Sequence, residues 1–223
     1  MEKAKVKNLI NSIKRAIKVP LKFHWSVLIL PFLLFFYNGI LGVPLFLMLF
    51  GSLLFHEYSH VMMAQYKGYY VPYVLAHGFG AMAMVKMDNL ENFKDNFWIA
   101  VAGPVASFIL GGVAFILYLF FPSKWTLYLV YINLIFGLFN LLPLFPSDGG
   151  RILYSILGKR MGGLKAIKIS VLVSWILCGV GTLFCLVFGL YWIAIVLVLC
   201  ILMSIQEKNI TEARLKGYDI VLK

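Results

Sequence analysis

The sequence predicts an all-α polytopic membrane protein with six transmembrane helices and a small cytoplasmic-side β-hairpin or sheet between helices two and three. The first observation is composition, because 62% of the 223 residues are hydrophobic, only 13% are charged, and the mean hydropathy is +0.90. A soluble domain has about 45–50% apolar and about 25% charged residues. The second observation is a set of apolar segments of membrane-spanning length, and the third is a one-sided distribution of positive charge.

Residues 1–23 are expected to form a basic amphipathic segment on the cytoplasmic side. Its apolar side chains recur at helical spacing, at Val6, Leu9, Ile10, Ile13 and Ile17. Its cations lie elsewhere around the same helix, at Lys7, Lys14, Arg15 and Lys18. The pattern predicts a helix on an anionic membrane surface, with a solvated basic tail as the alternative. No cleaved signal peptide is expected, because the next apolar stretch is long and lacks a small-residue cleavage site.

Six apolar segments approach the roughly 20 residues that an α-helix needs to cross a bilayer. They cover residues 24–42, 44–66, 97–121, 125–145, 167–188 and 191–205. We therefore expect residues 24–206 to form one six-span membrane domain, and residues 207–223 to form a polar cytoplasmic tail.

Two connections between the spans are expected to lie outside the apolar interior. Residues 68–88 contain two β-prone runs, residues 69–75 and 81–85, around a glycine-containing turn, and this pattern predicts a hairpin. Residues 146–165 are rich in glycine and are expected to form a loop after the fourth span.

Positive charges predict the orientation of the spans. Six spans place both termini on one side of the membrane, and of the 20 Lys and Arg residues all except Lys124 fall on that side. Because cations accumulate on the cytoplasmic side, we expect both termini in the cytoplasm and the chain in the cell membrane. The same distribution accounts for the net charge of +11, so no nucleic-acid partner is expected.

The second predicted span carries the motif His56-Glu57-Tyr58-Ser59-His60. Residues four apart share a helix face, so the two imidazoles can bind one metal ion, usually Zn²⁺, with Glu57 in reach of a water on it. Polar and ionisable groups are costly inside a bilayer, so this cluster indicates a function. The alternative is a chance polar cluster packed between helices.

A catalytic zinc takes three protein ligands and a water, so a third ligand is needed. Asp148 is the favoured candidate, because the fourth span ends on the same side of the membrane as His60. Two other histidines remain alternatives: His24 begins the first span, and His77 lies in the predicted hairpin turn. One Zn²⁺ per chain is expected.

Two motifs together resemble the site-2 protease family of intramembrane zinc metalloproteases. One is the His-Glu-x-x-His motif, and the other is the segment that runs from Asn140 through Pro143 to Asp148, two spans later. Weaker similarities lie in residues 21–26, 78–81 and 102–107, so that the resemblance covers about residues 20–155.

The resemblance is to a compact form of the family, without the PDZ or CBS domains that many members carry. Two positions depart from the family's pattern: Ser59 stands where glycine is common, and Ser147 stands where an apolar residue is common. Neither position is a predicted ligand or base, so we expect an active enzyme.

The resemblance implies an intramembrane zinc endopeptidase that cleaves transmembrane segments of membrane-protein substrates, in regulated intramembrane proteolysis. His56, His60 and Asp148 would hold the zinc, and Glu57 would act as general base for the zinc-activated water. Asn140 resembles the family residue thought to hold substrate backbone, and an interhelical hydrogen bond is the alternative role.

The hairpin offers further candidate substrate-binding residues at Gly78, Gly80 and Met82. A substrate helix must unwind before it is cut, and an unwound segment can pair with a strand edge. The partners expected are thus substrate transmembrane segments and the lipid bilayer.

Two other functions fit parts of the pattern. A membrane zinc peptidase of another class would need a Glu as third ligand, and Glu207 at the end of the sixth span lacks a matching motif. A membrane metal-binding or transport protein would have no use for a carboxylate beside His56. Glu57 therefore discriminates between an enzyme and a transporter.

Overall fold

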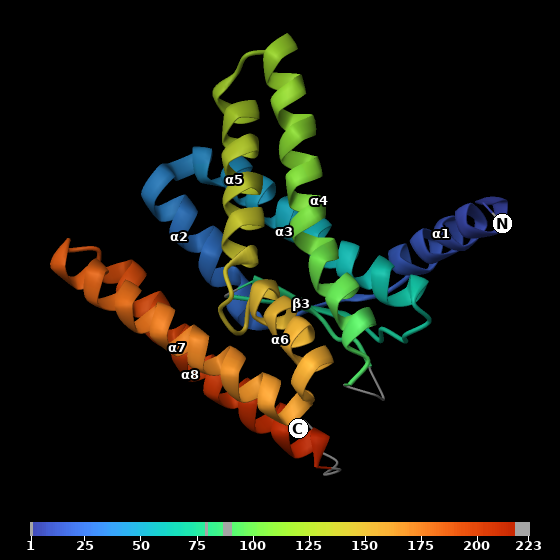
Figure 1. Ribbon diagram of the computed structural model, residues 1–223. Helices are drawn as coiled ribbons and strands as arrows, with labels where there is room; N and C mark the ends of the chain where they lie inside the picture. Colours follow the sequence, from blue (N-terminus) through green and yellow to red (C-terminus); the bar gives the residue numbers. More distant parts are fainter. Residues whose placement is uncertain (1, 79, 87–90, 217–223) are drawn as a thin grey trace. The chain divides into compact units, whose positions relative to one another are not determined.

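The computed structural model describes residues 2–78, 80–86 and 91–216 (Figure 1). Its α-helices are α1 (Glu2–Ile17), α2 (Ile29–Asn38), α3 (Gly42–Tyr66), α4 (Phe93–Phe120), α5 (Lys124–Leu141), α6 (Asp148–Met161), α7 (Gly163–Val187) and α8 (Tyr191–Leu215). Its strands are β1 (Leu21–Phe23), β2 (Val74–His77) and β3 (Gly80–Ala83), and two 3₁₀ turns, η1 (Trp25–Leu28) and η2 (Gly39–Leu41), flank α2.

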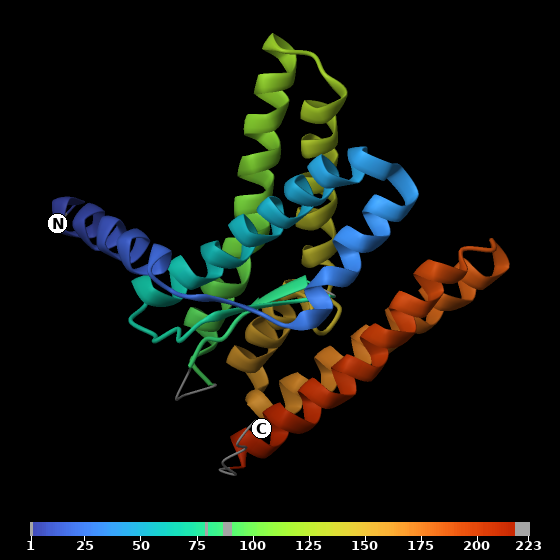
Figure 2. The same ribbon diagram turned by 180° about the vertical axis from the view of Figure 1, so that it is seen from behind.

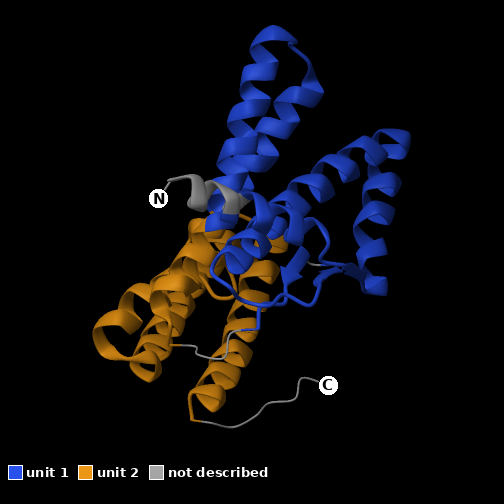
Figure 3. Cartoon of the chain, turned by 90° about the vertical axis from the view of Figure 1, so that its right-hand side faces the viewer, with its two compact units in different colours: residues 1–87, 102–138 blue, residues 88–101, 139–223 orange. Residues whose placement is uncertain are grey.

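The chain divides into two compact units (Figure 3). The first unit comprises residues 1–87 and 102–138, and the second comprises residues 88–101 and 139–223. The first unit holds the sheet and α1 to α3, and the second holds α6 to α8. Helix α4 begins in the second unit and continues into the first, and α5 ends in the second.

Five helical stretches in the described part of the chain are long and apolar enough to cross a membrane. They are the stretch Trp25–Tyr66, which contains α2 and α3, and the helices α4, α5, α7 and α8. Large apolar side chains are exposed along them, among them Phe36 at 73% and Trp192 at 83%. Such an apolar surface is stable in the hydrocarbon core of a bilayer, whereas in water it would favour aggregation.

The prediction of six spans is not confirmed, because the first predicted span is not one long helix. Helix α2 has 10 residues, and at 1.5 Å per residue it is about 15 Å long, roughly half the hydrocarbon thickness. It ends where Gly39 takes a positive φ of 57°. The chain then turns back, and Gly42 packs so closely against the Leu34 backbone that a side chain there would collide with it.

The predicted hairpin is present and belongs to a three-stranded sheet with the order β1-β2-β3. Strand β2 pairs antiparallel with β3, so that Leu75 faces Met82. Strand β1 pairs parallel with β2, and this strand was not predicted. The first β-prone run was placed too early, because residues 69–73 form no strand and contribute only a bridge between Tyr70 and Lys86.

The expectation of a glycine-rich loop at residues 146–165 was wrong, since most of this segment is the helix α6. Helix α6 has Asp148 in its first turn and Lys159 in its last, which suits the helix dipole. Its glycines serve close packing: a side-chain carbon at Gly149 would collide with the carbonyl oxygens of Leu141 and Leu142.

The polar tail expected from residue 207 is helical in its described part, and its cytoplasmic location stays a prediction. Helix α8 continues to Leu215, and Lys208 lies 4.0 Å from Glu212 one turn later. Such i,i+4 pairs support a helix beyond its apolar part. Helices α7 and α8 lie side by side and antiparallel (Figure 2), and Trp175 donates its indole N–H to Ser204 Oγ at 2.8 Å.

The close packing of Gly149 predicts a position-specific loss of stability. We expect Gly149→Ala to destabilise the protein by roughly 1–3 kcal/mol, because backbone atoms must move to admit the methyl group. Gly179→Ala in α7 is the matched control, since no atom lies within 4 Å of a side-chain carbon there. Thermal unfolding in detergent measures both variants. Equal melting temperatures for the two would contradict this account of α6.

Candidate metal centre

His56 and His60 lie on one face of α3, as their spacing predicts. Both are buried, with 3% of each residue exposed. Their rings meet edge to face with centroids 4.9 Å apart, and each ring offers one nitrogen within 4.8 Å of the other's. Two imidazoles at this separation can each give one nitrogen to the same transition metal, such as zinc.

Helix α4 approaches the two imidazoles closely at Gly103. A side-chain carbon at Gly103 would collide with the Nε2 atoms of both His56 and His60. The residue is therefore small where the two Nε2 atoms lie, and any larger side chain would displace them. Both Nε2 atoms thus meet at one point beside the Gly103 backbone.

Ser107, one turn after Gly103 on α4, contacts the other nitrogen of His56. Its Oγ lies 2.9 Å from His56 Nδ1, and the residue is fully buried. A hydrogen bond at Nδ1 fixes the ring's orientation and leaves Nε2 for a metal, which is the usual arrangement of metal-binding histidines.

The Glu57 side chain extends from α3 to the edge of the sheet at β3. Its Oε2 accepts a hydrogen bond from the backbone N–H of Ala83 at 3.0 Å, and the residue is half-buried. The bond holds the carboxylate beside β3 and beside the helix turn that carries the histidines.

A second buried polar contact lies on α3 one turn before His56. Asn133 of α5 is fully buried and donates to Ser52 Oγ at 2.9 Å. Asn140 was the residue of this helix predicted to bind substrate, and the contact of Asn133 was not predicted. Asn140 lies in the last turn of α5, where it is half-buried.

Asp148 lies in the second unit, as the first residue of α6. It is buried, with 7% exposed, and Arg151 lies 3.9 Å away on the next turn. The preceding residue, Ser147, uses its hydroxyl to donate to the carbonyl of Leu142 at 2.9 Å. This departure from the family's pattern therefore closes the turn between α5 and α6.

The alternative ligands His24 and His77 have other roles. His24 Nδ1 lies 2.8 Å from Ser26 Oγ at the start of η1. His77 is the last residue of β2. Burial is the main cause that lowers the pKa of His77 below the usual value for a histidine, and the charge of His24 lowers it further. Among the described residues, neither belongs to a cluster of metal-binding side chains.

The three candidate substrate-binding residues of the hairpin have distinct environments. The Gly78 N–H donates to Ser26 Oγ at 2.9 Å, and a side-chain carbon at Gly78 would collide with the Ser26 carbonyl. Gly80 has a φ of 142°, which few other residues adopt. Met82 is 49% exposed on β3. Gly78 thus has a structural reason to be glycine.

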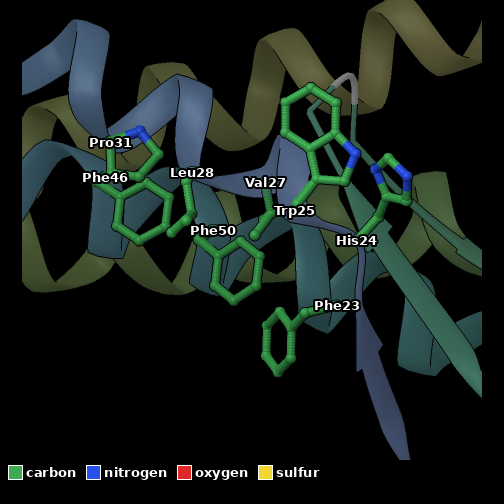
Figure 4. Close-up of a pocket in the computed structure, with 8 residues that line it drawn as sticks. All are labelled: Phe23, His24, Trp25, Val27, Leu28, Pro31, Phe46 and Phe50. Atoms are coloured by element: carbon green, nitrogen blue, oxygen red, sulfur yellow. The ribbon is translucent and has the colours of Figure 1, made fainter.

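A groove of about 560 Å³ lies elsewhere in the first unit (Figure 4). Aromatic rings dominate it, and Phe46 and Phe50 stack with centroids 5.3 Å apart. Its lining residues are Phe23, His24, Trp25, Val27, Leu28, Pro31, Phe46 and Phe50. Apart from His24 they are apolar or aromatic, so the groove suits apolar contacts.

Gly103 and Ser107 contact the two histidines, and neither was predicted from the sequence to belong to the site. Both lie in residues 102–107, where the resemblance gave only a weak similarity. Their spacing of four places them on one face of a helix, which is the one signal that links them. Small residues carry no charge or motif of their own, so only their contacts reveal them.

The chain matches known proteins along most of its length. It matches peptidase family M50 over residues 44–126 and 122–186. A zinc metalloprotease of Methanocaldococcus jannaschii is 36% identical over 200 residues, which cover 82% of this chain and 56% of that protein. Stage IV sporulation protein FB of Bacillus subtilis is 29% identical over 147 residues, which cover 65% of this chain and 48% of that protein. The chain spans about half the length of these curated relatives.

A solved structure has the same fold. The site-2 protease from Methanocaldococcus jannaschii matches with a TM-score of 0.71 and 28% sequence identity, over 92% of this chain and 94% of that chain. The long apolar helices and this similarity identify an integral membrane protein. The chain belongs to peptidase family M50, the site-2 protease family of zinc metalloproteases.

Proposed function

We propose that this chain is an intramembrane zinc endopeptidase that cleaves transmembrane segments of membrane-protein substrates. The observation that carries the proposal is the pair of Nε2 atoms of His56 and His60, which lie together beside Gly103. Glu57, the next residue on α3, adds a carboxylate that a metal-binding or transport protein would not need. Membership of the zinc metalloprotease family supports the same conclusion.

The proposed zinc ligands are His56 and His60 from the first unit and Asp148 from the second. Asp148 supports this set because it is a buried carboxylate, and a carboxylate oxygen is a common third ligand beside two imidazoles at a catalytic zinc. The resulting two nitrogens and one oxygen form a donor set typical of catalytic zinc, with a position left for water. One ion per chain follows.

Zinc bound there supplies a Lewis acid and lowers the pKa of a bound water to about 7. The protein's own contribution is the proton transfer. Glu57 accepts the proton of the attacking water and passes it to the leaving amine. The hydrogen bond from the Ala83 N–H holds the carboxylate in place for both transfers.

We further propose that the membrane domain crosses the bilayer six times with both termini in the cytoplasm. In this topology the stretch Trp25–Tyr66 crosses twice, with α2 and its 3₁₀ turns as the shorter first crossing. His56 and His60 then lie roughly 10–16 Å below the cytoplasmic surface, counted at 1.5 Å per residue from Lys67, the residue after α3. The positive-inside distribution supports the orientation, and the cell membrane is the proposed location.

The free edge of β3 is the proposed docking site for an unwound substrate. The Ala83 N–H bonds to Glu57, so it points away from β2, toward the free edge of β3. Backbone groups two residues apart in a strand point the same way, so those of Ala81 also face this edge. A substrate strand that pairs with this edge lies beside the catalytic carboxylate. Asn140 is proposed to bind substrate backbone as well.

Zinc binding and cleavage are expected to separate in two variants. Asp148→Ala loses a ligand, so it binds zinc more weakly than wild type. Glu57→Gln keeps every ligand and retains about one zinc per chain, but its cleavage rate falls by about 100-fold or more because no base remains. Metal content of the purified protein and cleavage of co-reconstituted single-span proteins measure the two effects.

Two outcomes would contradict this assignment. Unchanged zinc affinity in Asp148→Ala would remove that residue from the ligand set. Unchanged cleavage in Glu57→Gln would exclude it as the base. A metal transporter would give a third pattern, because Glu57→Gln would leave its transport intact and neither variant would show proteolysis.

Ser107→Ala is expected to lower the zinc affinity about 10- to 100-fold, because His56 loses the contact that orients its ring. Ser59→Ala is the matched control. The Ser59 hydroxyl donates to the Phe55 carbonyl at 2.7 Å, which is a bond within α3. Competition with a chelator of known affinity measures both variants, and equal affinities would show that Ser107 does not position the ring.

Ala81→Pro is expected to lower kcat/KM about 2- to 10-fold, because one hydrogen bond to the substrate strand is lost. Proline removes the N–H at the free edge and leaves the pairing of Met82 with Leu75. Ala81→Ser keeps the N–H and serves as the control. If Ala81→Pro cleaves as well as Ala81→Ser, with zinc content equal in both, substrates do not add to this edge.

A further inference from the structure

Helix α1 packs against the protein through small residues. Ser12 is fully buried and Ala16 is 4% exposed, and both lie on the side of the helix that contacts α3. Just beyond the helix, the Val19 carbonyl accepts a hydrogen bond from the Tyr58 hydroxyl at 2.9 Å. The helix is thus fixed to α3 close to the motif that carries the histidines.

The large apolar residues of α1 point away from the protein. Ile10 is 47% exposed, Ile13 is 39% exposed and Ile17 is 74% exposed. Their spacing of three and four places them in one stripe along the helix. A helix of a soluble protein would turn this stripe inward and leave Ser12 outside. The arrangement therefore needs an apolar environment beside the molecule.

Exposed lysines lie along one edge of the isoleucine stripe. Lys14 and Lys18 are both exposed, and residues 3–23 contain no Asp or Glu. By helical geometry Lys14 lies beside Ile10 and Ile17, and Lys18 lies next around the helix, whereas Arg15 lies further on, with Asn11, on the opposite side from Ile13. An apolar stripe with cations along one edge is complementary to a surface that is apolar below and anionic above.

We propose that this face of α1, made of Ile10, Ile13, Ile17 and the two lysines Lys14 and Lys18, lies on the surface of an anionic lipid bilayer. The chain itself keeps the bilayer within reach, because its first membrane stretch begins at Trp25. The residues between Ile17 and Trp25 extend at most roughly 30 Å. The isoleucines enter the acyl boundary, and the cations contact the phosphate groups.

The contact fixes more than α1. Tyr58 lies between His56 and His60 in the sequence, and its hydroxyl is bonded to the chain segment that follows α1. An α1 that rests on the bilayer surface therefore holds this end of α3 at a set depth. The proposal itself concerns lipid binding and does not depend on proteolytic activity.

The test uses the full chain in lipid nanodiscs, where both membrane surfaces are open to reagents. Ile13→Cys and Asn11→Cys replace two exposed residues on opposite sides of α1. A membrane-impermeant maleimide labels them in discs of phosphatidylcholine alone or with phosphatidylglycerol, and the unsubstituted protein gives the background of its own cysteines. In anionic discs we expect Ile13→Cys to react on the order of tenfold more slowly than Asn11→Cys.

The cations are tested in the same background. Lys14→Gln and Lys18→Gln together are expected to return the labelling of Ile13→Cys in anionic discs to its rate in neutral discs. Equal labelling of Ile13→Cys and Asn11→Cys in anionic discs would overturn the proposal and leave the stripe for a protein partner. Protection of Ile13→Cys that is the same in neutral and anionic discs would overturn the requirement for anionic lipid.

Discussion

The bilayer cannot hydrogen-bond polar groups, and this constraint decides where the polar side chains of the chain lie. In the first unit they occur as buried pairs that join helices. His56 of α3 meets Ser107 of α4, and Ser52 of α3 meets Asn133 of α5, each at 2.9 Å. Each pair links two helices and fixes how they are rotated relative to each other. The orientation of the face of α3 that carries His56 and His60 is thereby set by contacts within the protein.

Glycines make such pairs possible, because hydrogen-bonding side chains on neighbouring helices meet only where the backbones approach closely. Gly103 gives the two Nε2 atoms their space, and a side-chain carbon at Gly137 would collide with the ring of Phe108. The second unit uses the same device, since Gly150 packs against the backbone of Leu144 and Phe145. These three glycines therefore mark close backbone contacts rather than loops.

That distinction explains what the sequence could and could not predict. Periodicity predicted the shared face of His56 and His60, because helix geometry alone determines it. Hydropathy located the apolar stretches but not the break at Gly39, since it averages over a local change of backbone direction. Strand β1 has three residues, too few for an alternating pattern. Helix α6 was taken for a loop because its glycines were read as breakers, whereas tertiary contacts require them.

Three consecutive residues of the motif bond to three different parts of the first unit. His56 bonds to α4 through Ser107, Glu57 to β3 through the Ala83 N–H, and Tyr58 to the segment after α1 through the Val19 carbonyl. Successive helical residues point about 100° apart, so these bonds hold one turn of α3 from three sides. Ser59 donates to the Phe55 carbonyl within its own helix. The hydroxyl that replaces the family's frequent glycine is therefore satisfied inside α3, and the replacement leaves the three outside contacts in place.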